Sequence, residues 1–129
     1  MKDKRPVNLK LTAIHFPMTA IVSILHRLSG LLLFVLIPVF LYVFTALMAS
    51  PPRFNAWVAC FSTYASVRFI IWLLVAAMTY HLIAGIRHLL MDVGVAESLV
   101  GGRMAARLVL LIWVIVAIVL GMTIWLRLF

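Results

Sequence analysis

The sequence has few acidic residues and a single cysteine, and both shortages restrict its chemistry. Its three acids are Asp3, Asp92 and Glu97, against 11 lysines and arginines, and Cys60 is its one cysteine. One cysteine excludes an internal disulfide, and it excludes an iron–sulfur cluster or zinc site ligated by cysteines of this chain alone. The chain also lacks a glycine-rich dinucleotide-binding motif and has no acid within its long apolar runs. Chemistry of those kinds would have to reside in other subunits.

Polar composition is low enough to indicate an integral membrane protein. Hydrophobic residues make up 67% of the 129 residues and charged residues only 11%, whereas soluble domains carry about 25% charged residues. The formal net charge is +8. Because the basic residues separate apolar runs instead of forming a polar face, we interpret them as determinants of topology. They would contact lipid headgroups or anionic cofactor groups, not nucleic acid.

Three uncharged runs approach the ~20 residues that a membrane-spanning helix needs. They cover residues 28–52, 69–86 and 108–126. We therefore predict an all-α integral membrane fold, with one membrane-anchor domain over residues 1–129. The predicted transmembrane helices cover residues 22–50, 66–88 and 106–127, within a larger helical bundle that a partner subunit completes.

Loop signals separate the predicted helices. Pro51 and Pro52 should end the first helix, so the residues from Arg53 to Arg68 are expected to form a loop and the start of the second helix. Glycines 94, 101 and 102 indicate the second loop. The N-terminus does not resemble a signal peptide, because no small-residue cleavage site follows its charged start.

The distribution of basic residues predicts the topology. Eight of the 11 lie near the N-terminus or the second loop: Lys2, Lys4, Arg5, Lys10, Arg27, Arg87, Arg103 and Arg107. The remaining three are Arg53, Arg68 and Arg127. Since basic residues are retained on the cytoplasmic side, we expect the N-terminus in the cytoplasm and the C-terminus outside.

A first polar cluster begins the first predicted span. Ser23, His26, Arg27 and Gly30 recur at spacings of three and four residues, which places them on one helix face. Ionisable groups at such depth usually face a bundle interior or a cavity. The alternative is that His26 and Arg27 only anchor the helix among headgroups, while Ser23 bonds to backbone.

A second cluster ends the second predicted span. His81 and His88 are two turns apart with Gly85 between them, and His81 lies roughly 9 Å deeper than Arg87 along the axis. Haem iron accepts such an imidazole as an axial ligand, and Gly85 would leave room for a flat macrocycle or a close helix. The alternative is a His81 that hydrogen-bonds to a carbonyl or a serine across the bundle.

The cations nearer the surface suit the carboxylates of a haem. His26, Arg27, Arg87 and His88 all lie at the depth where propionates would meet water, and guanidinium groups bind carboxylates in pairs. Asp92 is expected to neutralise Arg87 or Arg103 in the loop, with proton delivery to a reduced quinone as the alternative. His15 is left unassigned.

These motifs resemble a known family. The matching elements are Arg5-Pro6, then Ser23-x-x-His26-Arg27-x-Ser29, then His81-x-x-x-Gly85-Ile86-Arg87-His88 through Asp92. Together with three spans over nearly the whole chain, they are similar to the cytochrome b556 membrane-anchor subunits of succinate dehydrogenase, respiratory complex II.

The resemblance implies roles for individual residues. It makes His81 one axial ligand of haem b, with the second ligand supplied by a second anchor subunit. It places Ser23 and Arg27 at a ubiquinone-reduction site, and we expect Ile24 and Phe16 to supply apolar walls there. His26, Arg27 and His88 would contact the haem propionates.

The whole assembly implied is a succinate:ubiquinone oxidoreductase in the bacterial cytoplasmic membrane, in which this chain is not catalytic alone. Its partners would be a second membrane anchor, an iron–sulfur subunit and a flavoprotein, and its electrons would pass from succinate to ubiquinone. Two alternatives stay open. One is the anchor of a quinol:fumarate reductase, and the other is a cofactor-free helical membrane subunit or transporter component.

Overall fold

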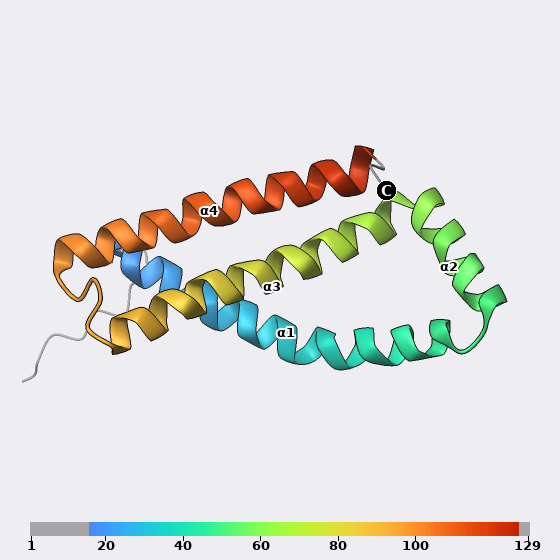
Figure 1. The fold of residues 1–129 in the computed structure, drawn as a ribbon, viewed down its shortest axis with the longest axis horizontal. Coiled ribbons are helices and arrows are strands. Elements are labelled where there is room, and N and C mark those ends of the chain that lie inside the picture. Colours follow the sequence, from blue (N-terminus) through green and yellow to red (C-terminus); the bar gives the residue numbers. More distant parts are fainter. Residues whose placement is uncertain (1–15, 127–129) are drawn as a thin grey trace, which may run out of the picture.

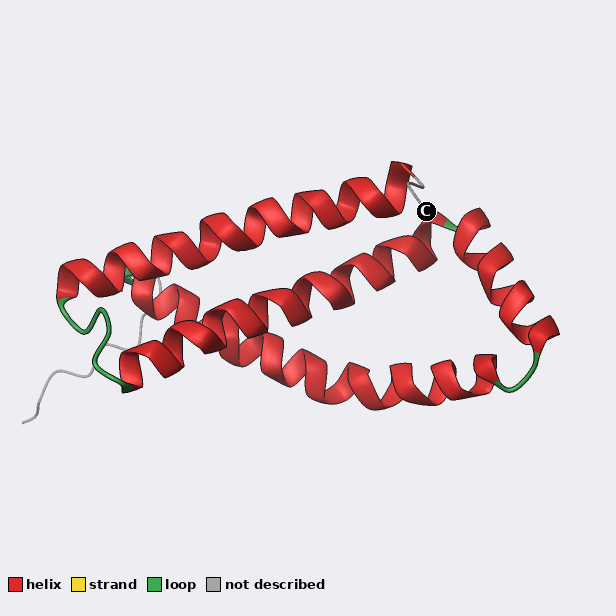
Figure 2. Cartoon of the chain, in the orientation of Figure 1, coloured by secondary structure: helices red, strands yellow, loops and turns green. Residues whose placement is uncertain are grey.

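Residues 16–126 are described by a computed structural model, in which they form four helices and no strand (Figure 2). The helices are α1 (Met18–Met48), α2 (Pro51–Thr63), α3 (Ala65–Asp92) and α4 (Leu99–Leu126). The Arg5-Pro6 motif, His15, the basic residues before Phe16, and Arg127 lie outside the described residues. In Figure 1, α3 and α4 run alongside each other and α1 crosses α3 near the end where α4 begins.

Three of these helices are long and apolar enough to cross a membrane, which confirms the predicted all-α membrane fold. α1 has 31 residues, and α3 and α4 have 28 each. At 1.5 Å per residue they reach about 42–46 Å, more than the ~30 Å hydrocarbon thickness. Their terminal turns therefore extend into the headgroup region. Three of the predicted bounds lie within two residues of the observed helix ends, and the other three differ by four to seven residues.

The first connection differs from the prediction. Residues 51–63, expected to lie mainly in a loop, form the 13-residue helix α2. Pro51 and Pro52 do end α1, but they also occupy the first turn of α2. That position suits proline because the backbone N–H groups of a first turn have no partner within the helix. Ser50 before them is extended, as the residue preceding a proline prefers.

The second connection is shorter than predicted. Gly94 does lie in the loop, with a positive φ of 85°, but Gly101 and Gly102 lie in the first turn of α4. There the hydroxyl of Ser98 accepts a hydrogen bond from the Gly101 N–H at 3.0 Å and caps the helix. A Cβ on Gly101 would lie 2.9 Å from the Ser98 hydroxyl and 3.1 Å from the Ala96 Cα. These glycines therefore permit close packing of the loop on α4.

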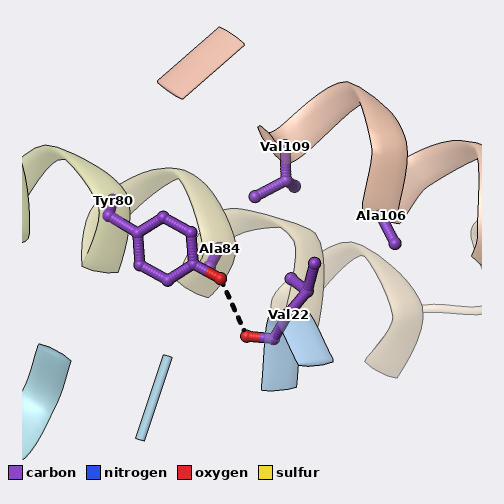
Figure 3. Close-up of a cluster of buried hydrophobic side chains, with 5 residues drawn as sticks. All are labelled: Val22, Tyr80, Ala84, Ala106 and Val109. Carbon is purple, nitrogen blue, oxygen red and sulfur yellow. Dashed lines mark hydrogen bonds between the residues drawn. The ribbon is translucent and has the colours of Figure 1, made fainter. Parts of the chain in front are cut away.

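Small side chains bring α1, α3 and α4 together at one end of the bundle. Val22 on α1, Ala84 on α3 and Ala106 on α4 are each 0% exposed. Tyr80 and Val109 complete this buried cluster (Figure 3). Small residues let helix backbones approach closely, which is a common basis of helix packing in membranes. The chain thus has its own core where the two polar clusters lie.

Hydrogen bonds from aromatic side chains to main-chain carbonyls link the helices. The Tyr80 hydroxyl donates to the Val22 carbonyl of α1 at 2.9 Å (Figure 3). The Trp72 indole N–H donates to Ala117 of α4, and the Trp113 indole N–H of α4 donates to Ala76 of α3, each at 2.9 Å. Each donor is therefore satisfied by the neighbouring helix, where lipid offers no acceptor.

The rest of α1 has little packing within the chain. Its buried residues are Val22, Ser29 and Leu33, so none of its positions after Leu33 is buried. Pro38 lies in this second part of the helix, which in Figure 1 runs away from α4 toward α2. Large apolar side chains such as Phe34, at 79%, are exposed there. Lipid or another subunit must cover them in a membrane.

Replacing Tyr80 tests the α1–α3 bond. Tyr80→Phe keeps the ring against Trp113 and removes only the hydroxyl, so it should reduce the free energy of unfolding by about 0.5–1.5 kcal/mol. Thermal unfolding of the protein in detergent measures this change. Tyr42→Phe is the matched control because Tyr42 is 77% exposed. Equal stability of the two variants would contradict the proposed contribution of this bond.

Candidate functional site

Three histidines from two helices form one cluster beside the buried core. His26 of α1 stacks on His81 of α3, with ring centroids 4.2 Å apart and an interplanar angle of 13°. His88, two turns further along α3, lies 5.0 Å from His26. All three side chains are half-buried. The structure therefore brings together the two polar clusters that the sequence analysis placed on separate helices.

The hydrogen bonds of His81 determine which of its ring nitrogens carries the proton. Its Nδ1 lies 3.1 Å from the His26 carbonyl oxygen and 3.1 Å from the Ser29 hydroxyl. The carbonyl can only accept, and Ser29 itself donates to that carbonyl at 2.8 Å. Nδ1 must therefore be the donor, and neutral His81 keeps its free electron pair on Nε2.

This arrangement includes the alternative considered for His81, since the imidazole does bond to a carbonyl and a serine across the bundle. It does not exclude ligation, because those bonds use Nδ1 alone. Metal-ligating histidines commonly donate their second ring N–H to a carbonyl in this way. Ser29, 8% exposed, was not predicted as a site residue. Its spacing of three residues from His26 was the available signal.

Two glycines allow the imidazoles to approach the opposite helix. A Cβ on Gly30 would lie 2.9 Å from the His81 Cε1, closer than real Cβ contacts allow. A Cβ on Gly85 would lie 3.4 Å from the His26 Nε2. Of the two explanations offered for Gly85, the structure provides the close helix. Gly30 likewise lets the His81 ring approach α1, and the contact there is closer than the one at Gly85.

The residues predicted to contact quinone lie in the first turns of α1 and, for Phe16, just before it. Ser23 is half-buried, whereas Arg27 is exposed, as are Phe16 at 45% and Ile24 at 41%. Ser23 and Arg27 lie one turn apart, and Arg27 directly follows the clustered His26. Neither side chain forms a hydrogen bond within residues 16–126. Both are therefore accessible to a molecule or subunit beside the imidazole cluster.

The Arg87 side chain points away from the histidines with which the sequence analysis grouped it by depth. It was grouped with the cations around the histidines, but α3 continues to Asp92 and the Arg87 side chain packs toward α4. It is 5% exposed and donates from Nη2 to the Gly102 carbonyl at 3.4 Å. Adjacent residues on a helix point about 100° apart, so His88 and Arg87 face different neighbours.

The prediction that Asp92 neutralises a loop arginine is also not met in the structure. Asp92 is exposed, and the part of the chain from Phe16 to Leu126 has no ion pair that joins it to Arg87 or Arg103. The α3 helix ends at Asp92 and the loop then turns away through Gly94. The geometry therefore gives Asp92 no partner among the residues that were expected to bind it.

Comparisons with known proteins agree with this architecture. Residues 1–120 match a family model described as the succinate dehydrogenase/fumarate reductase transmembrane subunit. One curated relative is the succinate dehydrogenase cytochrome b556 subunit of Coxiella burnetii (strain RSA 493 / Nine Mile phase I). It is 40% identical over 125 residues, which cover 97% of this chain and 100% of the relative.

A double-mutant cycle tests the Gly30–His81 contact. Gly30→Ala should destabilise the protein by about 1–3 kcal/mol, as overpacking usually does. In a His81→Ala background the clash is absent, so the same change should cost much less. Thermal unfolding of all four proteins gives the coupling energy, with Gly85→Ala as a milder control. An equal cost of Gly30→Ala in both backgrounds would show that the imidazole is not what the methyl group meets.

Proposed function

The chain belongs to the succinate dehydrogenase/fumarate reductase transmembrane subunit family, and we propose that this anchor subunit binds haem b and helps form a ubiquinone-reduction site. The observation that carries the haem proposal is the state of His81. Its Nδ1 is held by a carbonyl and a hydroxyl, which leaves the Nε2 electron pair for iron. The curated relative is named a cytochrome b556 subunit, and b-type cytochromes carry haem.

The remaining imidazoles and one guanidinium suit the acidic side of a haem. His26 and His88 lie within 5.0 Å of each other beside His81, and Arg27 follows on the accessible face of α1. We propose that these three groups hold the propionates, because charged and neutral N–H donors bind carboxylates well. The haem would supply one-electron transfer, and His81 and its hydrogen bonds would orient it.

We place the quinone beside this cluster, on the accessible face of α1. The Ser23 hydroxyl and the Arg27 guanidinium would donate to a quinone carbonyl and stabilise negative charge that develops during reduction. The exposed side chains of Phe16 and Ile24 would pack against the ring. Ser23 and Arg27 have no intramolecular hydrogen bond to give up within residues 16–126, so binding would not have to break one.

The topology proposal follows from the same end of the bundle. The α3–α4 loop lies at the end of the bundle where α1 begins (Figure 1). His26 lies near the start of α1 and His88 near the end of α3, so the histidine cluster lies toward this end, as do most of the basic residues in the sequence. This end would face the cytoplasm of a bacterial cell. An iron–sulfur subunit and a flavoprotein would dock there and deliver electrons from succinate. A second membrane anchor would supply the other axial ligand and cover the exposed side of the three spans.

Two other functions lead to different measurements. A fumarate reductase anchor, which the family model also includes, would pass electrons from quinol in the reverse direction. Comparing succinate oxidation with fumarate reduction in membranes separates these two. A cofactor-free helical subunit would show no haem b band in a reduced-minus-oxidised spectrum of the purified complex. The Nε2 group of His81 favours the haem-binding function.

His81→Leu tests the ligand. The substitution removes the proposed coordination bond and places an apolar side chain at the same position in the helix. The complex should therefore lose most of its haem or show a changed haem spectrum. The reduced-minus-oxidised spectrum, with haem extracted and quantified, measures this. His88→Leu should have a milder effect, because only a propionate contact would be lost. An unchanged low-spin spectrum in His81→Leu would refute the ligand assignment.

Ser23→Ala tests the quinone site. One hydrogen bond to a carbonyl contributes about 0.5–1.5 kcal/mol, and a charge-assisted one about 1.5–3 kcal/mol. Since ~1.4 kcal/mol corresponds to a tenfold rate change, quinone reduction should fall several-fold, and further in Arg27→Leu.

The measurement is the ratio of quinone reductase to succinate–dye reductase activity in membranes with equal amounts of complex. The dye reaction occurs in the soluble subunits and serves as the internal control. A wild-type ratio in Ser23→Ala would mean that this face of α1 only anchors the helix.

A further inference from the structure

Among residues 16–126, Arg87 is a buried cation without a counter-charge. Its side chain is 5% exposed, and its Nε is buried with no hydrogen-bond partner in this part of the chain. Its one hydrogen bond within residues 16–126 runs from Nη2 to the Gly102 carbonyl, at a long 3.4 Å. The acids described in the structure, Asp92 and Glu97, are both exposed and neither pairs with it. Isolated buried charges are strongly unfavourable, so such groups normally have an anionic partner.

The Arg87 side chain also lines a cavity of about 220 Å³ between α3, the α3–α4 loop and α4. Nearly all of the wall is apolar, and Arg87 is the one charged residue that lines it. Ile83 and Leu90 contribute from α3, Val95 from the loop, and Leu108 and Ile112 from α4. The cavity is therefore suited to a molecule with a negative group at one end and a hydrocarbon portion at the other.

The position of Arg87 along α3 fits the depth of lipid headgroups. α3 ends five residues later at Asp92, about 7.5 Å along the axis, and these helices are longer than the hydrocarbon region. From Arg87, the cavity wall extends back through Ile83 toward Ile112, in the direction of the membrane interior. Basic pockets between transmembrane helices on the cytoplasmic side are known to bind anionic headgroups.

We propose that this cavity is a binding site for an anionic phospholipid, whose phosphate pairs with the Arg87 guanidinium and whose acyl chain lies along Ile83, Leu108 and Ile112. A guanidinium binds phosphate oxygens through N–H donors, which would give Arg87 the counter-charge that it lacks within residues 16–126. The site is separate from the histidine cluster, because Arg87 packs toward α4 whereas His81 packs toward α1. The lipid would link α3, α4 and the loop between them.

The test uses the intact complex, purified in detergent and stripped of loosely bound lipid. Native mass spectrometry counts retained phospholipid, and titration with dioleoyl phosphatidylglycerol measures its return. Arg87→Met should weaken binding at least about tenfold, since a charge-assisted hydrogen bond is lost. Arg107→Met is the matched control, because Arg107 is an exposed arginine on α4 that does not line the cavity.

A second variant keeps the Arg87 guanidinium and blocks the part of the cavity in which the acyl chain would lie. Ile112→Trp should fill part of the cavity and also weaken phosphatidylglycerol binding, with all subunits still present. Dioleoylglycerol lacks the phosphate, so it should bind to the wild-type complex no more tightly than it binds to the Arg87→Met complex. Haem content is recorded separately, so a failure of this proposal does not affect the assignment of His81.

Three results would overturn the proposal. Retention of as much phosphatidylglycerol by Arg87→Met as by wild type would show that the guanidinium does not bind the lipid. Complete displacement of the lipid by inorganic phosphate at equal concentration would indicate a site for the free ion. Loss of another subunit from Arg87→Met, with lipid retained, would instead identify a carboxylate of that subunit as the partner of Arg87.

Discussion

Hydrocarbon cannot hydrogen-bond, so each polar side chain within this bundle must find its partner in protein. The chain meets that constraint mainly with main-chain carbonyls of neighbouring helices. Tyr80 bonds to Val22, Trp72 to Ala117 and Trp113 to Ala76. Each such bond joins a particular position of one helix to a particular position of the next. The relative rotation and height of α1, α3 and α4 follow from these pairs.

The histidine cluster obeys the same rule, and its chemistry results from it. His81 donates Nδ1–H to the His26 carbonyl and to Ser29, so the bond that satisfies the imidazole also selects its tautomer. Small residues make this possible, because Gly30 and Gly85 let each ring reach the opposite helix. Arg87 obeys the rule only in part, since its hydrogen bond to the Gly102 carbonyl is long and its Nε has no partner within residues 16–126.

Sequence reasoning was most successful where a single helix contains the whole signal. Apolar runs of spanning length predicted three membrane helices, whereas the shared face predicted for Ser23, His26 and Arg27 divides in the structure, because His26 stacks on His81 and Arg27 is exposed. It was less successful where two segments must be compared. The close packing of loop and helix at Gly101 depends on the position of Ala96, and the glycine alone indicates only a turn.

Arg87 and α2 are two further features that the sequence alone did not predict correctly. The direction of Arg87 depends on how α4 packs against α3, and neither its own spacing nor its charge contains that information. Residues 51–63 contain two prolines, which usually indicate a helix end, and here they form both an end and a beginning. Ser29 belongs to the motif quoted for the family resemblance, but the sequence analysis gave it no role. Its importance appears only with His81 opposite.

The confinement of buried α1 residues to positions up to Leu33 has a consequence for insertions and deletions. One added residue rotates the helix beyond it by about 100° and raises it by about 1.5 Å. Before Leu33 such a change would turn Ser29 or Val22 away from α3 and disconnect the imidazole cluster. After Leu33 it would rotate a segment with no buried position in this chain. Length variation among related anchors should therefore accumulate in the second half of this helix, where packing within this chain restricts it least.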